Sequence, residues 1–462
     1  ITASTYTASG LTNGTSYYAQ ITAFFNNSAF NSTDQTNNAL VGTPPSDALS
    51  GAGSRDFFTY DTYPLSDQTS VAVNVASGDL LLNQGDLTLP GVDGTAEVGQ
   101  VYNSLDLAPG ASSDGSILMS PGWRLDTGPD IHLTLGPAFV IFYDPSGAEW
   151  TFTASGSNWN APSGLDVLLV HQPNGTWTLN DQETNEQFIF DPAGVLLSES
   201  HESENSPSPV TFSSENQLSS QMRLTASAGF SSSDNVMLGP SGTGQLTTIT
   251  QIPGDGSANR VTTLSYNFAG QLISVTDAAG ETTTYSYDAN GNLSEVTSAA
   301  GRHLWFTYDS YHRVIQVDAY SGTGGTYSIT TYAYSGAPGA GATTDKDPLG
   351  NPTTYSYDSS FRVTATTDAA GFTTSTQWSN DSAVTFFTNQ AGVMSANTYG
   401  ANNNGNNGPE SLIGTKDPSG ATTSAKYSST SCASGLAAEF VPSVVTNNVG
   451  QTSSLCYDSA GD

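Results

Sequence analysis

The sequence predicts an all-β fold built of repeated antiparallel strand pairs. A repeat of 21 residues places Tyr266, Tyr287 and Tyr308 at equivalent positions. Each repeat carries turn signals such as Asp288-Ala289-Asn290-Gly291, in which Asp begins and Gly ends a four-residue type I turn. The segments between turns are about six or seven residues long and rich in Thr, Tyr and apolar residues, as in strands. Such units bury their apolar faces only by stacking on each other, so the array is the predicted fold.

Alternation within the strands predicts which face is buried. Tyr285 and Tyr287 lie on one face by the two-residue period of a strand, and so do Leu304, Phe306 and Tyr308. We expect this ring-bearing face to point into the protein.

The motif Tyr-Asp-x-x-Gly-x-Leu/Val, which reads YDANGNL at 287–293, resembles the YD repeat of the RHS and teneurin family. The dipeptide, the glycine, the aliphatic residue and the period all agree, and YNFAGQL and YDSYHRV echo the motif. The resemblance implies a long antiparallel β-sheet that spirals into a hollow shell. The structural corner residues are Tyr266, Tyr287, Asp288, Gly291, Tyr308, Asp309, Tyr357, Asp358, Tyr457 and Asp458.

The period continues beyond these repeats with insertions. Tyr357 follows Tyr308 after 49 residues, and Trp378 and Tyr399 then follow at steps of 21. Longer steps of 28 and 30 residues lead to Tyr427 and Tyr457. In repeat arrays such insertions lie in loops at an edge, so we expect the sheet to continue past them.

The first 66 residues differ in pattern. In residues 1–43, Leu11-x-x-Gly14-x-x-Tyr17 resembles the corner before the F strand of a fibronectin type III sandwich, so this range is predicted to hold its last strands. The missing strands lie upstream of this fragment or come from another chain. Residues 44–66, opened by Pro44-Pro45, are predicted to be a linker.

Residues 67–130 are similar to the N-terminal module found ahead of YD repeats in bacterial RHS proteins. The motifs VNVASGDL, LTLPG, VYNS and PGW occur there in one order. Gln100 stands where family members usually carry a basic residue before the YNS triplet. Residues 131–262 are predicted to be degenerate β repeats, and residues 263–462 to be YD repeats.

Composition limits the partners. Ten Lys and Arg against 42 Asp and Glu give a net charge of −32, which repels nucleic acid and anionic membranes. No apolar run approaches the ~18 residues of a spanning helix, so we expect no membrane insertion in this segment. The chain begins at Ile1 and ends within a turn near Asp458, so we expect further parts of the polypeptide outside it.

No catalytic, cofactor or metal site is predicted. The five histidines lack metal-ligand spacing, and no Gly-x-Ser-x-Gly elbow occurs. Asp347-Pro348-Leu349-Gly350 matches the first half of the self-cleaving element of RHS proteins, but its second half is missing, so a turn is expected. Cys432 and Cys456 could form one disulfide in an exported protein, or remain buried thiols.

These observations favour a secreted or cell-surface structural scaffold that is not an enzyme. By resemblance, its shell encloses or presents a C-terminal effector or toxin that lies outside this fragment. The alternative is an extracellular adhesin or fibre subunit, assembled through strand contacts between neighbouring protomers. A polysaccharide-binding or lyase activity on exposed Tyr and Trp rows is a third hypothesis.

Overall fold

The computed structural model describes most of the chain between residues 52 and 456, together with two short strands before it. The described residues are 18–19, 39–40, 52–90, 95–106, 119–165, 167–181, 186–201, 210–215, 221–226, 234–241, 245–253, 255–320, 325–400, 411–427 and 442–456. The chain divides into two units, residues 1–50 and 51–462. In the first unit, β1 (Tyr18–Ala19) pairs antiparallel with β2 (Ala39–Leu40). The rest of the predicted fibronectin-like range lies outside the described residues.

The second unit contains three antiparallel sheets. The five-stranded sheet comprises β3 (Tyr60–Pro64), β4 (Thr69–Asn74), β5 (Leu80–Pro90), β6 (Thr95–Asn103) and β7 (Trp123–Leu125). The four-stranded sheet comprises β8 (His132–Leu135), β9 (Phe139–Tyr143), β10 (Glu149–Ser155) and β11 (Asn158–Asn160). Between these two sheets lies a single 3-10 turn, η1 (Gly128–Asp130), which is the only helical element of the described residues.

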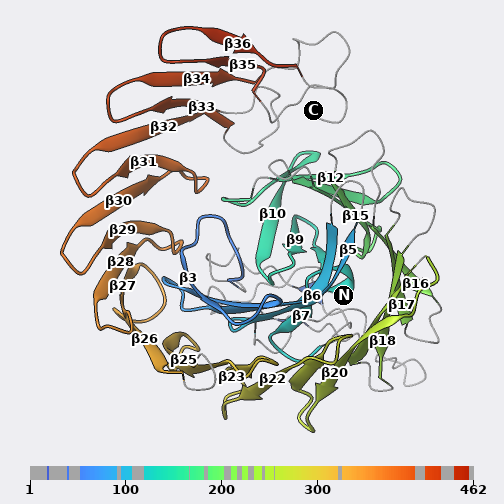
Figure 1. The fold of residues 1–462 in the computed structure, drawn as a ribbon. Coiled ribbons are helices and arrows are strands. Elements are labelled where there is room, and N and C mark those ends of the chain that lie inside the picture. The colour runs from blue at the N-terminus through green and yellow to red at the C-terminus, as the bar shows by residue number, and fades with distance from the viewer. Residues whose placement is uncertain are drawn as a thin grey trace, which may run out of the picture. The chain divides into compact units, whose positions relative to one another are not determined.

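The third sheet contains 25 strands that follow one another in chain order, each hydrogen-bonded to the next (Figure 1). Its first part comprises β12 (Val167–His171), β13 (Trp177–Asp181), β14 (Glu186–Phe190), β15 (Leu196–His201), β16 (Val210–Glu215), β17 (Gln221–Ala226), β18 (Asp234–Pro240), β19 (Leu246–Ile252), β20 (Arg260–Tyr266), β21 (Leu272–Thr276), β22 (Thr282–Tyr287), β23 (Leu293–Thr297), β24 (His303–Tyr308) and β25 (Val314–Tyr320). It continues with β26 (Tyr327–Tyr334), β27 (Gly341–Lys346), β28 (Pro352–Tyr357), β29 (Val363–Thr367), β30 (Thr373–Trp378), β31 (Val384–Thr388), β32 (Met394–Gly400), β33 (Ser411–Lys416), β34 (Thr422–Lys426), β35 (Val444–Thr446) and β36 (Thr452–Ser454).

The predicted fold class is confirmed. The described chain is all-β, and one antiparallel sheet runs through every repeat that the sequence marks out between Tyr266 and Tyr399. The sheet begins earlier than the regular repeats do, at β12, because the strands from Val167 onward pair in the same consecutive way without keeping the 21-residue period.

The predicted buried face is confirmed where the five-stranded sheet covers the repeats. Tyr285, Leu304 and Phe306 are 4%, 3% and 5% exposed. Tyr287 and Tyr308 are half-buried, because each stands at the end of its strand beside a register shift and points its hydroxyl toward the neighbouring hairpin. Apolar side chains from both sheets therefore form a shared core.

A second part of the core lies between the four-stranded sheet and the first strands of the long sheet. The Phe142 ring of β9 lies 5.9 Å from the Phe188 ring of β14 and 6.3 Å from that of Phe190. The N–H of Leu133 in β8 donates to the carbonyl of Gly194 at 2.8 Å. Burial falls toward the other end of the long sheet, and all three residues of β36 are exposed.

Candidate functional site: the repeat corners and the contacts made on them

Each corner is organised by the side chain of its first residue. At Asp288, one carboxylate oxygen accepts from the N–H groups of Asn290 and Asn292 at 2.8 and 2.9 Å. Gly291, at φ +89°, then turns the chain into the next strand, while its N–H donates to the Asp288 carbonyl at 3.2 Å. This is a type I turn followed by a residue in the left-handed region, a common three-residue hairpin loop. The corner predicted from Asp288 and Gly291 is thus present.

The second carboxylate oxygen of the corner Asp binds the side chain four residues later. Asp309 accepts from Nε of Arg313 at 2.8 Å, and Asp358 accepts from Nε of Arg362 at 2.8 Å. At Asp288 the partner is the amide of Asn292, also at 2.8 Å. The same arrangement forms at Asp347, which confirms that the Asp347–Gly350 stretch is a turn.

The tyrosine of the repeat joins one hairpin to the one before it. Its hydroxyl donates to the carbonyl of the aliphatic residue that follows the preceding corner, 15 residues earlier. Trp378 makes the same contact with its indole N–H, which explains why it replaces tyrosine at this position. The pairs are Tyr287 to Leu272 (2.5 Å), Tyr308 to Leu293 (2.7 Å), Trp378 to Val363 (2.9 Å), Tyr399 to Val384 (3.0 Å) and Tyr427 to Leu412 (3.1 Å).

Two of the predicted corner tyrosines make a different hydrogen bond. Tyr266 donates to the carbonyl of Leu246, 20 residues earlier, at 2.7 Å. The hydroxyl of Tyr357 instead accepts from Oγ1 of Thr343 at 3.3 Å. Tyr457 and Asp458 lie outside the described residues. Sequence reasoning found the tyrosines by their period but not the bond they make, because the acceptor is a backbone atom of another hairpin.

Replacing Tyr308 by phenylalanine is expected to lower the free energy of unfolding by about 1–3 kcal/mol, because the carbonyl of buried Leu293 loses its donor. Urea denaturation followed by far-UV circular dichroism measures this loss. Tyr427→Phe is the matched control, since it removes the same kind of bond at an exposed position and should cost less than about 0.5 kcal/mol. Equal losses in the two variants would contradict the role assigned to burial.

The five-stranded sheet and its loops contact three successive corners of the long sheet. At each corner the contact is made by the same backbone N–H group. The backbone N–H of Leu272, Leu293 and Val314, which stand 21 residues apart, donates to a group of residues 67–130 in each case. The three acceptors are Oγ of Ser120 at 3.1 Å, the hydroxyl of Tyr102 at 2.9 Å and the carbonyl of Gly78 at 2.9 Å.

These acceptors belong to, or adjoin, three of the four motifs singled out in the sequence. Gly78 lies in VNVASGDL, Tyr102 in VYNS, and Ser120 directly precedes PGW. The carbonyls of the same aliphatic residues accept from tyrosine hydroxyls, those of Tyr287, Tyr308 and, for Val314, Tyr334 at 2.7 Å. Both backbone groups of each aliphatic residue are thereby bound, one by the neighbouring repeat and one by the docked module.

Aromatic packing reinforces the central contact. Trp123 is 5% exposed, and its indole N–H donates to the hydroxyl of Tyr287 at 2.8 Å. The Trp123 ring lies 4.7 Å from the Tyr285 ring and 5.4 Å from that of Tyr102, at angles of 64° and 56°. Edge-to-face pairs of this kind add stability beyond the area they bury.

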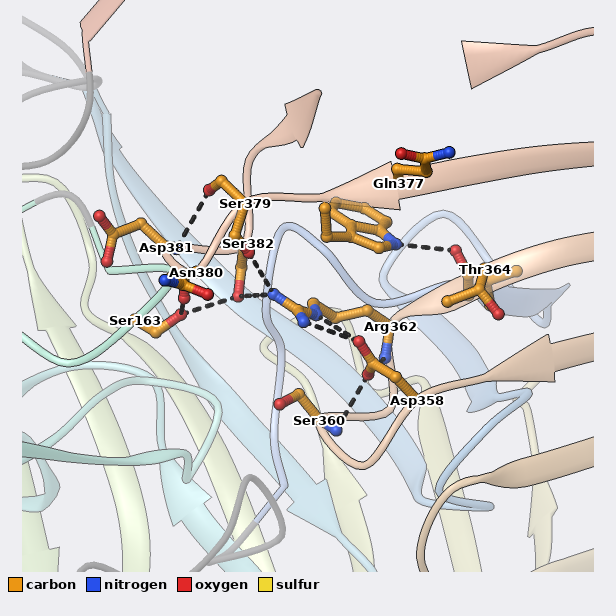
Figure 2. Close-up of polar contacts among 12 residues, drawn as sticks. Ser163, Asp358, Ser360, Arg362, Thr364, Gln377, Ser379, Asn380, Asp381 and Ser382 are labelled. Carbon is orange, nitrogen blue, oxygen red and sulfur yellow. Dashed lines mark hydrogen bonds and ion pairs between the residues drawn. The ribbon is translucent and has the colours of Figure 1, made fainter. Parts of the chain in front are cut away.

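A polar contact joins the beginning of the long sheet to its later strands (Figure 2). Ser163, four residues before β12, donates to the carbonyl of Asn380 at 2.7 Å, and its hydroxyl lies 2.9 Å from that of Ser382. Arg362, held by Asp358, donates through Nη1 to the Ser379 carbonyl at 2.8 Å. The turn before β12 and the corner between β30 and β31 are therefore held together.

At three corners of the described residues, the fourth position is not glycine. The residue there still adopts the positive φ that glycine has at the other corners. His312, Phe361 and Ser382 have φ values of 63°, 60° and 64°. Each side chain makes a contact that offsets the strain. Nδ1 of His312 lies 2.7 Å from Oδ1 of Asn292, Phe361 is 1% exposed, and Ser382 meets Ser163. At the His312 and Ser382 corners, the residue with positive φ contacts another segment of the chain.

Several carboxyl groups in and beside the five-stranded sheet are fully or partly buried. Asp79 is fully buried and accepts from the N–H of Gly53 at 3.1 Å, from Oγ of Ser104 at 2.9 Å and from the N–H of Leu105 at 3.2 Å. Burial outweighs these bonds and raises the pKa of Asp79 to about 7. Burial also raises the pKa of Asp86 to about 7 and that of Glu199 to about 8.

Acidification is therefore expected to stabilise this region. A carboxyl group whose pKa in the folded protein lies above its unfolded value of about 4 adds stability at low pH, and this stability is lost as the pH rises through the folded pKa. The melting temperature should be higher at pH 5 than at pH 8. Differential scanning calorimetry measures the shift.

Asp79→Asn is the informative variant for this pH dependence. It should melt at a lower temperature than the wild type at both pH values, because one acceptor of the buried cluster becomes a donor that faces the N–H of Gly53. Its rise in melting temperature between pH 8 and pH 5 should also be smaller. An unchanged pH dependence would show that Asp79 is ionised in the folded protein at neutral pH.

The predictions on cysteines, metals and membranes can be compared with the structure only where their residues are described. Cys456 is disulfide-bonded, and Cys432 lies outside the described residues, so the pairing stays a prediction. In the described ranges, no group of three or more His, Cys, Asp or Glu side chains could hold a metal ion. Among the same residues, no helix has the length and apolarity needed to cross a membrane.

Comparison with known proteins finds RHS repeats in two segments. Residues 266–303 and 339–373 match the RHS Repeat family model, and they contain the corners at Tyr266, Tyr287 and Tyr357. The chain thus carries RHS repeats, as the motif spacing predicted.

Two curated relatives are named as tRNA nucleases and match a similar share of the chain. The tRNA nuclease WapA of Bacillus subtilis (strain 168) is 26% identical over 182 residues, which are 39% of this chain and 7% of that protein. The tRNA3(Ser)-specific nuclease WapA of Bacillus spizizenii is 26% identical over 194 residues, 42% of this chain and 8% of that protein. The matched part spans less than a tenth of each relative's length.

Solved structures of TcdB2-TccC3 proteins are also similar. The TcdB2-TccC3-Cdc42 crystal structure aligns with 87% of this chain and 26% of its own, at a TM-score of 0.36 and 12% identity. A Photorhabdus luminescens Tc holotoxin pore with the TccC3 mutation D651A aligns with 88% of this chain and 26% of its own, at a TM-score of 0.32 and 12% identity.

Proposed function

We propose that this chain is part of the β-sheet scaffold of a secreted or cell-surface RHS-repeat protein, which encloses or presents a C-terminal effector or toxin outside this segment. Two sequence findings support the proposal. RHS repeats occupy residues 266–303 and 339–373. The relatives that match about two fifths of the chain are named as nucleases, and the matched part makes up only 7% and 8% of their lengths. In this proposal the effector supplies the activity, and the chain itself is not an enzyme and needs no cofactor.

The observation that carries the proposal is the docking of one module on three consecutive repeats. Ser120, Tyr102 and Gly78 bind the same backbone position in each repeat, so that the module and the long sheet are fixed in register. A scaffold needs this rigidity, because a wall that encloses another domain must keep its shape against that domain. The partner in this proposal is the protein's own effector, and the net charge of −32 disfavours nucleic acid as a partner of the scaffold.

Protease protection in the full-length protein tests this function. The full open reading frame is expressed, and the C-terminal part is followed by immunoblotting during limited proteolysis. We expect the C-terminal part to be degraded at least tenfold more slowly in the full-length protein than when it is expressed alone. A variant that loosens the module, Trp123→Ala, should remove much of this protection.

Degradation at the same rate with and without the scaffold would contradict enclosure. Electron microscopy of the same sample then distinguishes the remaining alternative, an adhesin or fibre subunit, in which protomers associate through strand contacts. The unprotected sample would show fibres or higher oligomers if that alternative holds.

A further inference from the structure

A group of aromatic side chains lies on the face of the long sheet that points away from the five-stranded sheet. Leu304 and Phe306 of β24 are buried under the docked module, so the alternating residues His303 and Trp305 belong to the opposite face. Strand register places His303 beside Tyr320 of β25, and Tyr320 beside Tyr327 of β26. We call these four residues, His303, Trp305, Tyr320 and Tyr327, the outer aromatic patch.

The four rings are in continuous contact. The centroids of His303 and Trp305 are 5.0 Å apart with planes 4° from parallel, and those of Tyr320 and Tyr327 are 5.1 Å apart at 33°. Trp305 also lies 5.8 Å from Tyr327. Tyr327 is 63% exposed and the adjacent Ile329 is 45% exposed, so solvent reaches the patch. Because the opposite face supplies the core, these half-buried and exposed rings are not required to bury the sheet.

Polar groups surround Trp305 on both sides. Its cross-strand neighbours are Glu295 in β23 and Asp318 in β25. Nδ1 of His303 lies 3.0 Å from Oε1 of Glu295 and 2.9 Å from Oγ1 of Thr297, which fixes the ring. The amide of Gln316 donates to Asp318 at 2.7 Å. Carboxylates and an amide are thus held at the rim of a half-exposed indole.

This combination suits one chemical class of ligand. The C–H face of a sugar ring packs on an aromatic ring, while its hydroxyls donate to carboxylates and exchange hydrogen bonds with an amide. An anionic glycan would be repelled by Glu295 and Asp318 and by the net charge of −32. A neutral glycan meets no such penalty.

We propose that the outer aromatic patch is a binding site for neutral hexopyranose oligosaccharides, in which Trp305 and Tyr327 stack on sugar rings and Glu295, Gln316 and Asp318 bind hydroxyls. This surface activity is separate from the scaffold role of the opposite face. It gives the chain a means of attachment to glycan-coated surfaces that does not depend on any other domain.

Titration calorimetry of the 462-residue chain with neutral hexasaccharides tests the site. The probes are cellohexaose, hexa-N-acetylchitohexaose, maltohexaose and mannohexaose, each at millimolar concentration. We expect at least one to bind, and Trp305→Ala and Tyr327→Ala each to weaken that binding at least tenfold. Tyr327→Ala removes a mostly exposed ring and so leaves the fold intact even where Trp305→Ala does not.

Phe372→Ala is the matched control. Phe372 is 56% exposed, lies at the corner between β29 and β30 outside the patch, and should be replaced without any effect on binding. Failure of all four hexasaccharides to bind would overturn the proposal, as would unchanged affinity in Tyr327→Ala. Tight binding of tetramethylammonium in place of sugar would also overturn it and would identify the patch as a site for cations on aromatic rings. None of these outcomes bears on protease protection, which tests the scaffold function.

Discussion

Replacing Trp123 by alanine is expected to lower the free energy of unfolding by about 3–5 kcal/mol, the usual cost of truncating a buried tryptophan. The side chain is 5% exposed and packs between Tyr102 and Tyr285, and its N–H binds the hydroxyl of Tyr287. The substitution therefore removes packing volume and leaves that hydroxyl without its donor. Chemical denaturation followed by far-UV circular dichroism measures the change.

Trp305→Ala is the matched control for this prediction. It makes the same chemical change on the opposite face of the long sheet, where Trp305 is only half-buried. We expect a loss of about 1 kcal/mol there. A similar loss in both variants would mean that Trp123 does not hold the two sheets together.

The second large effect is expected at Gly78. Its φ of +73° disfavours any residue with a side chain, and an added Cβ would lie 2.4 Å from Cβ of Arg313. Alanine here must therefore push the loop away from the corner and break the bond from the N–H of Val314 to the Gly78 carbonyl. We expect Gly78→Ala to lower the free energy of unfolding by about 3 kcal/mol or more, from backbone strain and a lost buried contact together.

Gly280→Ala separates strain from collision. Gly280 has a φ of +86°, but nothing lies within 4 Å of the position where its Cβ would stand. This variant should lose about 1–2 kcal/mol, the cost of backbone strain alone. Limited proteolysis gives a second readout, because only Gly78→Ala should expose the 67–130 region to cleavage. If Gly280→Ala is equally destabilised, the docking of Gly78 on the corner contributes nothing measurable.

Much of the repeat could be predicted because its causes are local. The corner at Asp288 and Gly291 follows from side-chain oxygens that reach backbone N–H groups two and four residues later. The buried face of Tyr285 and Phe306 follows from alternation within a single strand. Such features need no knowledge of where any other strand lies.

The contacts between the repeats and other parts of the chain join residues that are far apart in the sequence, so they could not be predicted. The partner of Ser163 at the β30–β31 corner stands 219 residues away, and nothing in either segment signals the other. The 67–130 region was recognised by its motifs, but their shared target on Leu272, Leu293 and Val314 appears only in three dimensions. The members of the outer aromatic patch could not be named from the sequence for the same reason, because Tyr320 meets His303, and Tyr327 meets Trp305, only in the folded sheet.

The three acceptors at Ser120, Tyr102 and Gly78 limit where such a chain can gain or lose repeats. Recombination between near-identical units adds or deletes whole units, and a unit inserted between Leu272 and Val314 would shift one of these residues away from its acceptor. The contact of Ser163 with the corner between β30 and β31 sets the same limit on units before that corner, and units past β31 meet no such triplet among the described residues. Expansion and contraction of the array are therefore expected to be confined to its distal part, while the number of units nearest the module stays constant.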